Sequence, residues 1–90
     1  MVKLDVEGFE PLVIRGARNF FSRGITDFAL VEVSEWTEAR TGVHYSEVYT
    51  ELARCGFEQV YIFQDGSLVR VRTDENASLP VNRNVLFSKE

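Results

Sequence analysis

The pattern of apolar and polar residues predicts a strand, a helix and a second strand in the first third of the chain. Residues 2–6 read Val-Lys-Leu-Asp-Val, with an apolar side chain at every second position, which is typical of a strand. Residues 28–33 are almost continuously apolar, as in a strand covered on both faces. Between them, residues 11–23 carry apolar side chains at three- and four-residue spacing and predict one helix, which Gly24 ends. Gly16, inside that helix, is expected to let the helix approach the sheet closely. A right-handed βαβ connection makes the two strands parallel neighbours.

The rest of the chain predicts a second helix followed by a run of strands. The predicted elements are a helix at 46–55 and strands at 57–63, 68–72 and 84–88. Ser46 is the expected cap of the helix, and Asp65-Gly66 is a hairpin signal between the first two of these strands. The polar stretches 36–43 and 73–82 are predicted to be loops. The fold class is therefore α/β, with a parallel βαβ core followed by an antiparallel C-terminal hairpin and strand.

Carboxylates gather where the first two predicted strands end. Asp5 and Glu7 are two residues apart and project on the same side, while Glu32 and Glu35 come at the end of the second strand. Parallel neighbours place their carboxyl ends on one edge of the sheet, and open α/β sheets bind ligands at that edge. Asp5 lies within an otherwise apolar strand, so it must find a partner there. We therefore expect these carboxylates to meet at one site.

Several residues near this edge are candidate substrate contacts, each with a structural alternative. Glu10 either contacts substrate or complements the positive end of the helix that opens at the following proline. Trp36 either closes over a substrate or packs at the sheet edge. His44 and Glu35 complete the set, His44 with a surface position as its alternative. Glu7 has the alternative of a solvated turn residue.

Length, charge and cysteine content limit the classes of function. Ninety residues make one small domain, and a net charge of −4 without charged blocks argues against nucleic acid or an anionic membrane as a partner. No apolar run is long enough to cross a bilayer, and the N-terminus lacks a signal-peptide pattern. Cys55 is the single cysteine, which suits a reducing compartment. These features predict a cytoplasmic protein.

The motif Asp-Val-Glu-Gly-Phe-Glu at 5–10, followed by Val-Ile-Arg-Gly-Ala at 13–17, resembles the FkbM family of S-adenosylmethionine-dependent methyltransferases. Leu-Val-Glu-Val at 30–33 resembles the next strand of that family. The resemblance implies a partial Rossmann-like class I methyltransferase sheet, in which residues 1–90 are the C-terminal half of the catalytic domain. It also implies S-adenosylmethionine as the cofactor, with Asp5 beside the methyl group. The glycine-rich turn and the ribose-binding acidic residue of such enzymes do not occur in the sequence, so the cofactor would be held mainly by an N-terminal half, and the isolated chain is expected to be inactive.

The family implies O-methylation of a hydroxyl on a small molecule or sugar. Such a reaction needs a base for the hydroxyl proton, and Asp5, Glu7 and Glu32 are the candidates. The same carboxylates could instead hold a divalent metal that acidifies the hydroxyl. The alternative to an enzyme is a non-catalytic α/β interaction module that pairs through its open sheet edge. In either case residues 2–6 form an exposed edge strand, and self-association is expected.

Overall fold

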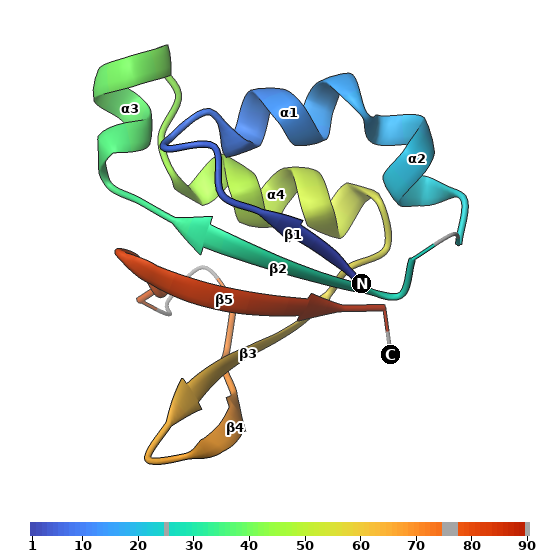
Figure 1. Cartoon of the computed structure of the whole chain (residues 1–90), viewed down its shortest axis with the longest axis vertical. Helices are drawn as coiled ribbons and strands as arrows, with labels where there is room; N and C mark the ends of the chain where they lie inside the picture. The colour runs from blue at the N-terminus through green and yellow to red at the C-terminus, as the bar shows by residue number, and fades with distance from the viewer. Residues whose placement is uncertain (25, 75–77, 90) are drawn as a thin grey trace.

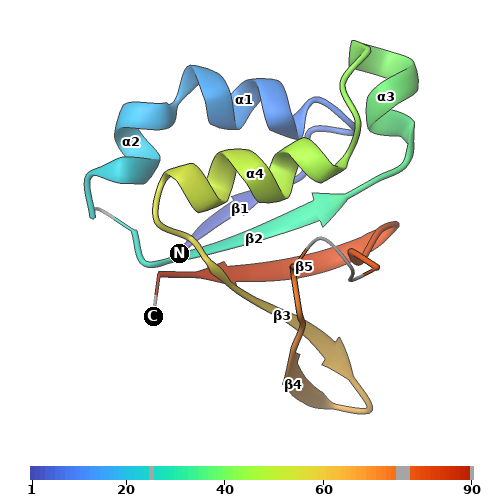
Figure 2. The same ribbon diagram turned by 180° about the vertical axis from the view of Figure 1, so that it is seen from behind.

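The computed structural model of the chain describes residues 1–24, 26–74 and 78–89. Within these residues five strands form one sheet, and α1, α2 and α4 lie over one of its faces (Figures 1 and 2). The strands are β1 (Val2–Leu4), β2 (Phe28–Val33), β3 (Gln59–Gln64), β4 (Ser67–Arg70) and β5 (Arg83–Ser88). The helices are α1 (Glu10–Gly16), α2 (Arg18–Ser22), α3 (Trp36–Thr41) and α4 (Ser46–Arg54). The expected α/β class is confirmed.

The sheet is open and mixed, with the strand order β1-β2-β5-β3-β4. β1 and β2 are parallel, as the βαβ pattern predicted, and the remaining pairs are antiparallel. β5 is the last strand in the chain, yet it lies in the middle of the sheet between β2 and β3. This insertion brings the start of β5 to the carboxyl end of β2.

The hydrophobic core lies between the sheet and the helices. Ala29, Val31 and Val33 of β2 are fully buried, and their side chains alternate with the half-buried Leu30 and Glu32 on the other face. The other fully buried core residues include Ile14, Val48, Leu52, Val85 and Phe87. The sheet face opposite the helices carries no helix from the described part of the chain (Figures 1 and 2).

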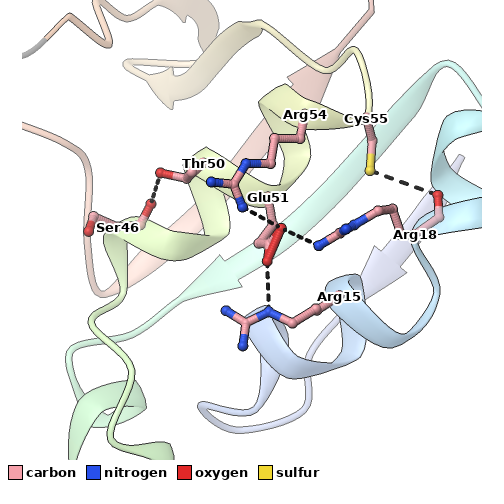
Figure 3. Close-up of polar contacts among 7 residues, drawn as sticks. All are labelled: Arg15, Arg18, Ser46, Thr50, Glu51, Arg54 and Cys55. Carbon is pink, nitrogen blue, oxygen red and sulfur yellow. Dashed lines mark hydrogen bonds and ion pairs between the residues drawn. The ribbon is translucent and has the colours of Figure 1, made fainter.

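A buried carboxylate joins the helices. Glu51 of α4 is 1% exposed, and it accepts hydrogen bonds from Arg15 Nε at 2.8 Å and Arg18 Nη2 at 3.2 Å, while Arg54 Nη1 lies 3.4 Å from it (Figure 3). These bonds, the one from Arg15 above all, lower the pKa of Glu51 although its burial acts in the opposite direction. One side chain of α4 thereby holds both α1 and α2.

The predicted helix at 11–23 is interrupted. α1 and α2 meet at Ala17, whose φ of −106° and ψ of 25° are outside the helical range. The role predicted for Gly16 was also wrong, because a Cβ built there would have no neighbouring atom within 4 Å. Gly16 is exposed and does not approach the sheet. Gly24, by contrast, has the positive φ of 75° expected of a residue that follows a helix end.

The predicted loop at 36–43 was wrong, since it contains α3. This helix is six residues long and buries only Thr37, so it has no apolar stripe that a sequence pattern could show. Ser34 Oγ accepts the Trp36 N–H at 3.1 Å where the helix begins, and Gly42 ends it with a φ of 75°. The helix at 46–54 is as predicted, but Ser46 is not its cap. His44 Nδ1 instead accepts the Ser46 N–H at 3.2 Å.

The strands match their predicted positions within a few residues. β1 is shorter than predicted because the Val6 N–H donates to the Glu10 carboxylate rather than to a neighbouring strand. The hairpin between β3 and β4 is confirmed. Asp65 and Gly66 have φ values of 51° and 81°, the pair of positive angles that a type I′ turn requires.

Candidate active site

The turn between β1 and α1 is organised by Glu10. Its carboxylate is almost fully buried and accepts the Val6 N–H at 2.9 Å and the Gly8 N–H at 3.0 Å. Both carboxylate oxygens are therefore engaged inside the turn, so the geometry favours the structural alternative over a substrate contact for Glu10. Glu7 has a positive φ of 51° at the tip of the turn and is exposed.

Helix α3 packs against this turn at Gly8. A Cβ on Gly8 would lie 2.9 Å from Arg40 Cδ and 3.4 Å from Thr37 Cα, and the residue has a φ of 99°. Only glycine combines this backbone conformation with so close a neighbour. The turn after β1 and the helix after β2 are thus held together at the carboxyl edge of the sheet.

Asp5 and Glu32 meet at this edge, as the parallel pairing predicted. The register joins Leu4 to Val31, so the next residue of each strand is one of these two acids. The negative charge of Asp5 is the largest influence on Glu32 and raises its pKa; partial burial and the charges of Glu10 and Glu7 act in the same direction. Glu32 therefore holds a proton more strongly than an ordinary glutamate.

Two pockets open beside Glu32. The smaller one, about 200 Å³, is lined by Glu7, Glu32, Ser34, Trp36 and Arg40. The larger one, about 450 Å³, is lined by Glu32, Ser34, Glu35, Trp36, Asn82, Arg83 and Asn84. Trp36 borders both pockets and is 64% exposed, so it is not packed at the sheet edge as its structural alternative required. The structure thus brings together Glu7, Glu32, Glu35 and Trp36.

The polar residues at the start of β5 were missed by sequence reasoning. β5 pairs with β2 so that Asn84 lies opposite Glu32 and Arg83 opposite Val33. Asn82 has a positive φ of 60°, and its Oδ1 accepts the Glu35 N–H at 3.0 Å. The sequence indicated a last strand but not its neighbour in the sheet, so these side chains could not be assigned to the site.

His44 is not brought to the pockets. It is exposed, its ring lies 4.3 Å from that of Tyr45, and its Nδ1 lies 2.8 Å from Ser46 Oγ at the start of α4. It lines neither pocket at Glu32. Its contacts are those of a residue that shapes the beginning of a helix.

The metal alternative finds no support in the described residues. Across residues 1–24, 26–74 and 78–89, no three His, Cys, Asp or Glu side chains are grouped so that they could hold a metal ion. In the same ranges, no helix has the length and apolar character needed to cross a membrane.

An open α/β sheet with carboxylates and pockets at the ends of two parallel strands is an arrangement found in many enzymes, which bind their ligands at that edge. The family model described as the methyltransferase FkbM domain matches residues 1–58, which is more than half of the chain and includes both parallel strands. The chain therefore belongs to the FkbM methyltransferase family, a family of enzymes, and this membership implies S-adenosylmethionine as the methyl donor. No curated protein and no solved structure is significantly similar to it.

Three backbone N–H groups of the turn after β1 have partners within the chain. In the turn after β1, the N–H groups of Val6 and Gly8 donate to Glu10, and that of Phe9 donates to the Val6 carbonyl at 3.2 Å. These groups are unavailable to a ligand, and the sequence has no Gly-x-Gly turn that would offer others. Among the described residues, Glu7, Glu32 and Glu35 line the two pockets at this edge.

Proposed function

We propose that residues 1–90 are the C-terminal, acceptor-binding half of an S-adenosylmethionine-dependent methyltransferase domain with a class I, Rossmann-like sheet. The reaction is O-methylation of a hydroxyl on a small molecule or sugar. The observation that carries the proposal is the Asp5–Glu32 carboxylate pair beside two pockets at the carboxyl edge of the parallel strands. The cofactor is held mainly by a separate half, with Asp5 nearest to it.

Glu32 accepts the proton of the acceptor hydroxyl. A hydroxyl must lose its proton as the new O–C bond forms, and a carboxylate with a raised pKa is the better proton acceptor. Asp5 supplies the charge that raises the pKa of Glu32. Glu7 lines the smaller pocket together with Glu32 and is the second candidate base.

Trp36 and Glu35 bind the acceptor in the larger pocket. The exposed indole offers an apolar face to a ring, and the carboxylates and amides around it accept or donate hydrogen bonds to hydroxyl groups. The lining of this pocket contains two glutamates and one arginine, so it has an excess of acidic side chains, which disfavours anionic acceptors. A neutral, hydroxylated acceptor satisfies both features.

The test is made in a complete methyltransferase in which this chain is joined to a cofactor-binding half. Glu32→Gln and Asp5→Asn keep shape and hydrogen bonding but remove one charge each. Turnover should fall by a factor of about 10² to 10⁴ in Glu32→Gln, the usual range for losing a general base, while cofactor affinity stays the same. Asp5→Asn should lower turnover less and shift the acid limb of the pH profile to lower pH, because it lowers the pKa of Glu32.

Glu38→Gln is the matched control. Glu38 is an exposed carboxylate on α3 that lines neither pocket, so its loss should leave turnover unchanged. Full activity in both Glu32→Gln and Asp5→Asn would remove the pair from the mechanism and leave Glu7 to be tested.

A second candidate function is an interaction module that pairs through its sheet edge. The observation that favours it is the position of β1, which has β2 as its single neighbour in the described part of the chain. Self-association through this strand requires no chemistry at the carboxylates, so it can hold whether or not the chain takes part in catalysis.

A further inference from the structure

Asn84 is a polar side chain of the larger pocket and a direct cross-strand neighbour of the proposed base. It lies opposite Glu32 in the antiparallel pair of β2 and β5, and both residues line that pocket. We propose that Asn84 binds a second hydroxyl of the acceptor, next to the one that is methylated, so that the acceptor is a vicinal diol. This inference rests on the function proposed above, because it names the acceptor class of the same site.

Glu32 and Asn84 lie on the same face of the sheet. The flanking residues of their strands that are fully buried beneath the helices are Val31, Val33 and Val85. Because side chains alternate along a strand, the side chains of Glu32 and Asn84 both lie on the open face. Directly opposed residues on one face have Cβ atoms about 4.5–5.5 Å apart. The carboxylate and the amide can therefore reach neighbouring atoms of one small molecule.

The other two polar residues at the start of β5 have structural roles. Asn82 Oδ1 accepts the Glu35 N–H at 3.0 Å, and Arg83 Nη2 donates to the Phe63 carbonyl at 2.7 Å. The side chain of Asn84 is exposed and has no hydrogen-bond partner in the described part of the chain. Its amide is therefore available to a ligand, with two N–H donors and one oxygen acceptor.

An N–H donor suits a neighbouring hydroxyl better than the hydroxyl that reacts. The negative charge on the acceptor oxygen falls as its bond to the methyl carbon forms. A hydrogen bond donated to that oxygen would thus stabilise the ground state more than the transition state and would slow the reaction. A hydrogen bond to the adjacent hydroxyl holds the acceptor without this loss. Glu32 therefore takes the proton of one hydroxyl, and Asn84 donates to the oxygen of the next.

The surroundings of this pair favour a ring that carries the two hydroxyls on one edge. The next opposed pair on the open face is Leu30 and Leu86, and both are partly buried. Polar contacts from the two strands therefore end at Glu32 and Asn84 in that direction. Trp36 borders the same pocket with its indole exposed, and it offers an apolar face to the C–H groups of a ring.

NMR titration of the 90-residue chain tests the inference, with the cis vicinal diol of cyclohexane as the probe and cyclohexanol as its monohydroxy analogue. Both probes are small, so we expect roughly millimolar dissociation constants. The diol should bind about three- to tenfold more tightly than cyclohexanol, which is the gain from one hydrogen bond. Its binding should also shift the side-chain amide signals of Asn84 and the indole N–H signal of Trp36.

Asn84→Ala should remove this preference, so that the diol binds with the affinity of cyclohexanol. Asn19→Ala is the matched control, because Asn19 is also exposed but lies on α2, which lines neither pocket at Glu32. This control should keep the preference for the diol. The dispersion of the NMR signals shows whether each variant is folded.

Asn84→Asp tests the placement of the side chain without any ligand. A carboxylate at this position should raise the pKa of Glu32 further, because two negative charges would then be direct cross-strand neighbours. NMR titration of the Glu32 carboxyl carbon against pH measures its titration midpoint in the parent chain and in the variant. An unchanged midpoint would place the two side chains apart and remove the basis of the inference.

Failure of the parent chain to bind the diol, or equal affinity for the diol and cyclohexanol, would overturn the inference. A preference for the diol that survives Asn84→Ala would overturn it as well. None of these measurements involves methyl transfer. The turnover of Glu32→Gln and Asp5→Asn in a complete methyltransferase therefore decides the proposed function separately.

Discussion

Glu51 shows how one charged residue can fix the arrangement of three helices. Its carboxylate is buried between α1, α2 and α4, while its arginine partners remain about half exposed. Because the arginines can turn to water when the carboxylate is lost, the contribution of the cluster is smaller than that of a fully buried ion pair.

Replacing Glu51 with Gln should lower the free energy of unfolding by about 1–2 kcal/mol, the scale of charge-assisted hydrogen bonds with partly exposed partners. Folding lowers the pKa of Glu51, so its contribution is present above the ordinary value of 4.5 and is lost as the pH falls through the lowered value. Urea unfolding of the parent chain and the variant at neutral and acid pH measures the difference in their free energies of unfolding. A difference that stayed constant with pH would contradict the prediction.

Glu32 should show the opposite dependence. Its pKa is raised in the folded chain, so ionising it costs stability; the cost is absent below the ordinary value of 4.5 and complete above the raised value. Glu32→Gln should therefore stabilise the chain at neutral pH by about 0.5 kcal/mol, the scale of a repulsive cross-strand pair. This gain in the free energy of unfolding should vanish at acid pH. Thermal unfolding at the two pH values checks this, and a loss of stability at neutral pH would show that Asp5 does not repel Glu32.

At the scale of the elements, the two glycines of the β1–α1 region should respond oppositely to alanine. Gly16→Ala should stabilise the monomer by about 0.5–1 kcal/mol, because the site is helical and nothing lies within 4 Å of the new Cβ. Gly8→Ala should destabilise it by about 1–3 kcal/mol, because the positive φ is strained for alanine and Arg40 is too close. Chemical denaturation at low protein concentration measures the free energy of unfolding of both variants. Equal changes in this free energy would show that backbone conformation does not distinguish these sites.

The elements also show what the sequence could and could not predict. Parallel pairing of β1 with β2, and with it the meeting of Asp5 and Glu32, followed from the strand–helix–strand pattern because that connection has few alternatives. α3 was missed because a short helix with one buried residue leaves no periodic signal. The break at Ala17 was missed because the apolar spacing continues across it to Phe20 and Phe21, so the local pattern is that of one helix.

At the scale of the whole molecule, the 90-residue chain should not bind S-adenosylmethionine with micromolar affinity. The N–H groups of Val6, Gly8 and Phe9 in the first turn are engaged by Glu10 and the Val6 carbonyl, and the sequence has no glycine-rich turn. Isothermal titration calorimetry with the cofactor should show no binding heat. Micromolar binding would mean that the acceptor-side pockets also hold the cofactor.

The central position of β5 also determines when the protein can fold. A chain that emerges from the ribosome has β2 and β3 before β5 exists, and neither strand can pair with the other because the place between them is empty. Until then Val85 and Phe87, which are fully buried in the finished sheet, are missing from the core. Assembly of the sheet must therefore wait until residues 83–88 have left the exit tunnel, and β2 and β3 each keep an unpaired edge until then.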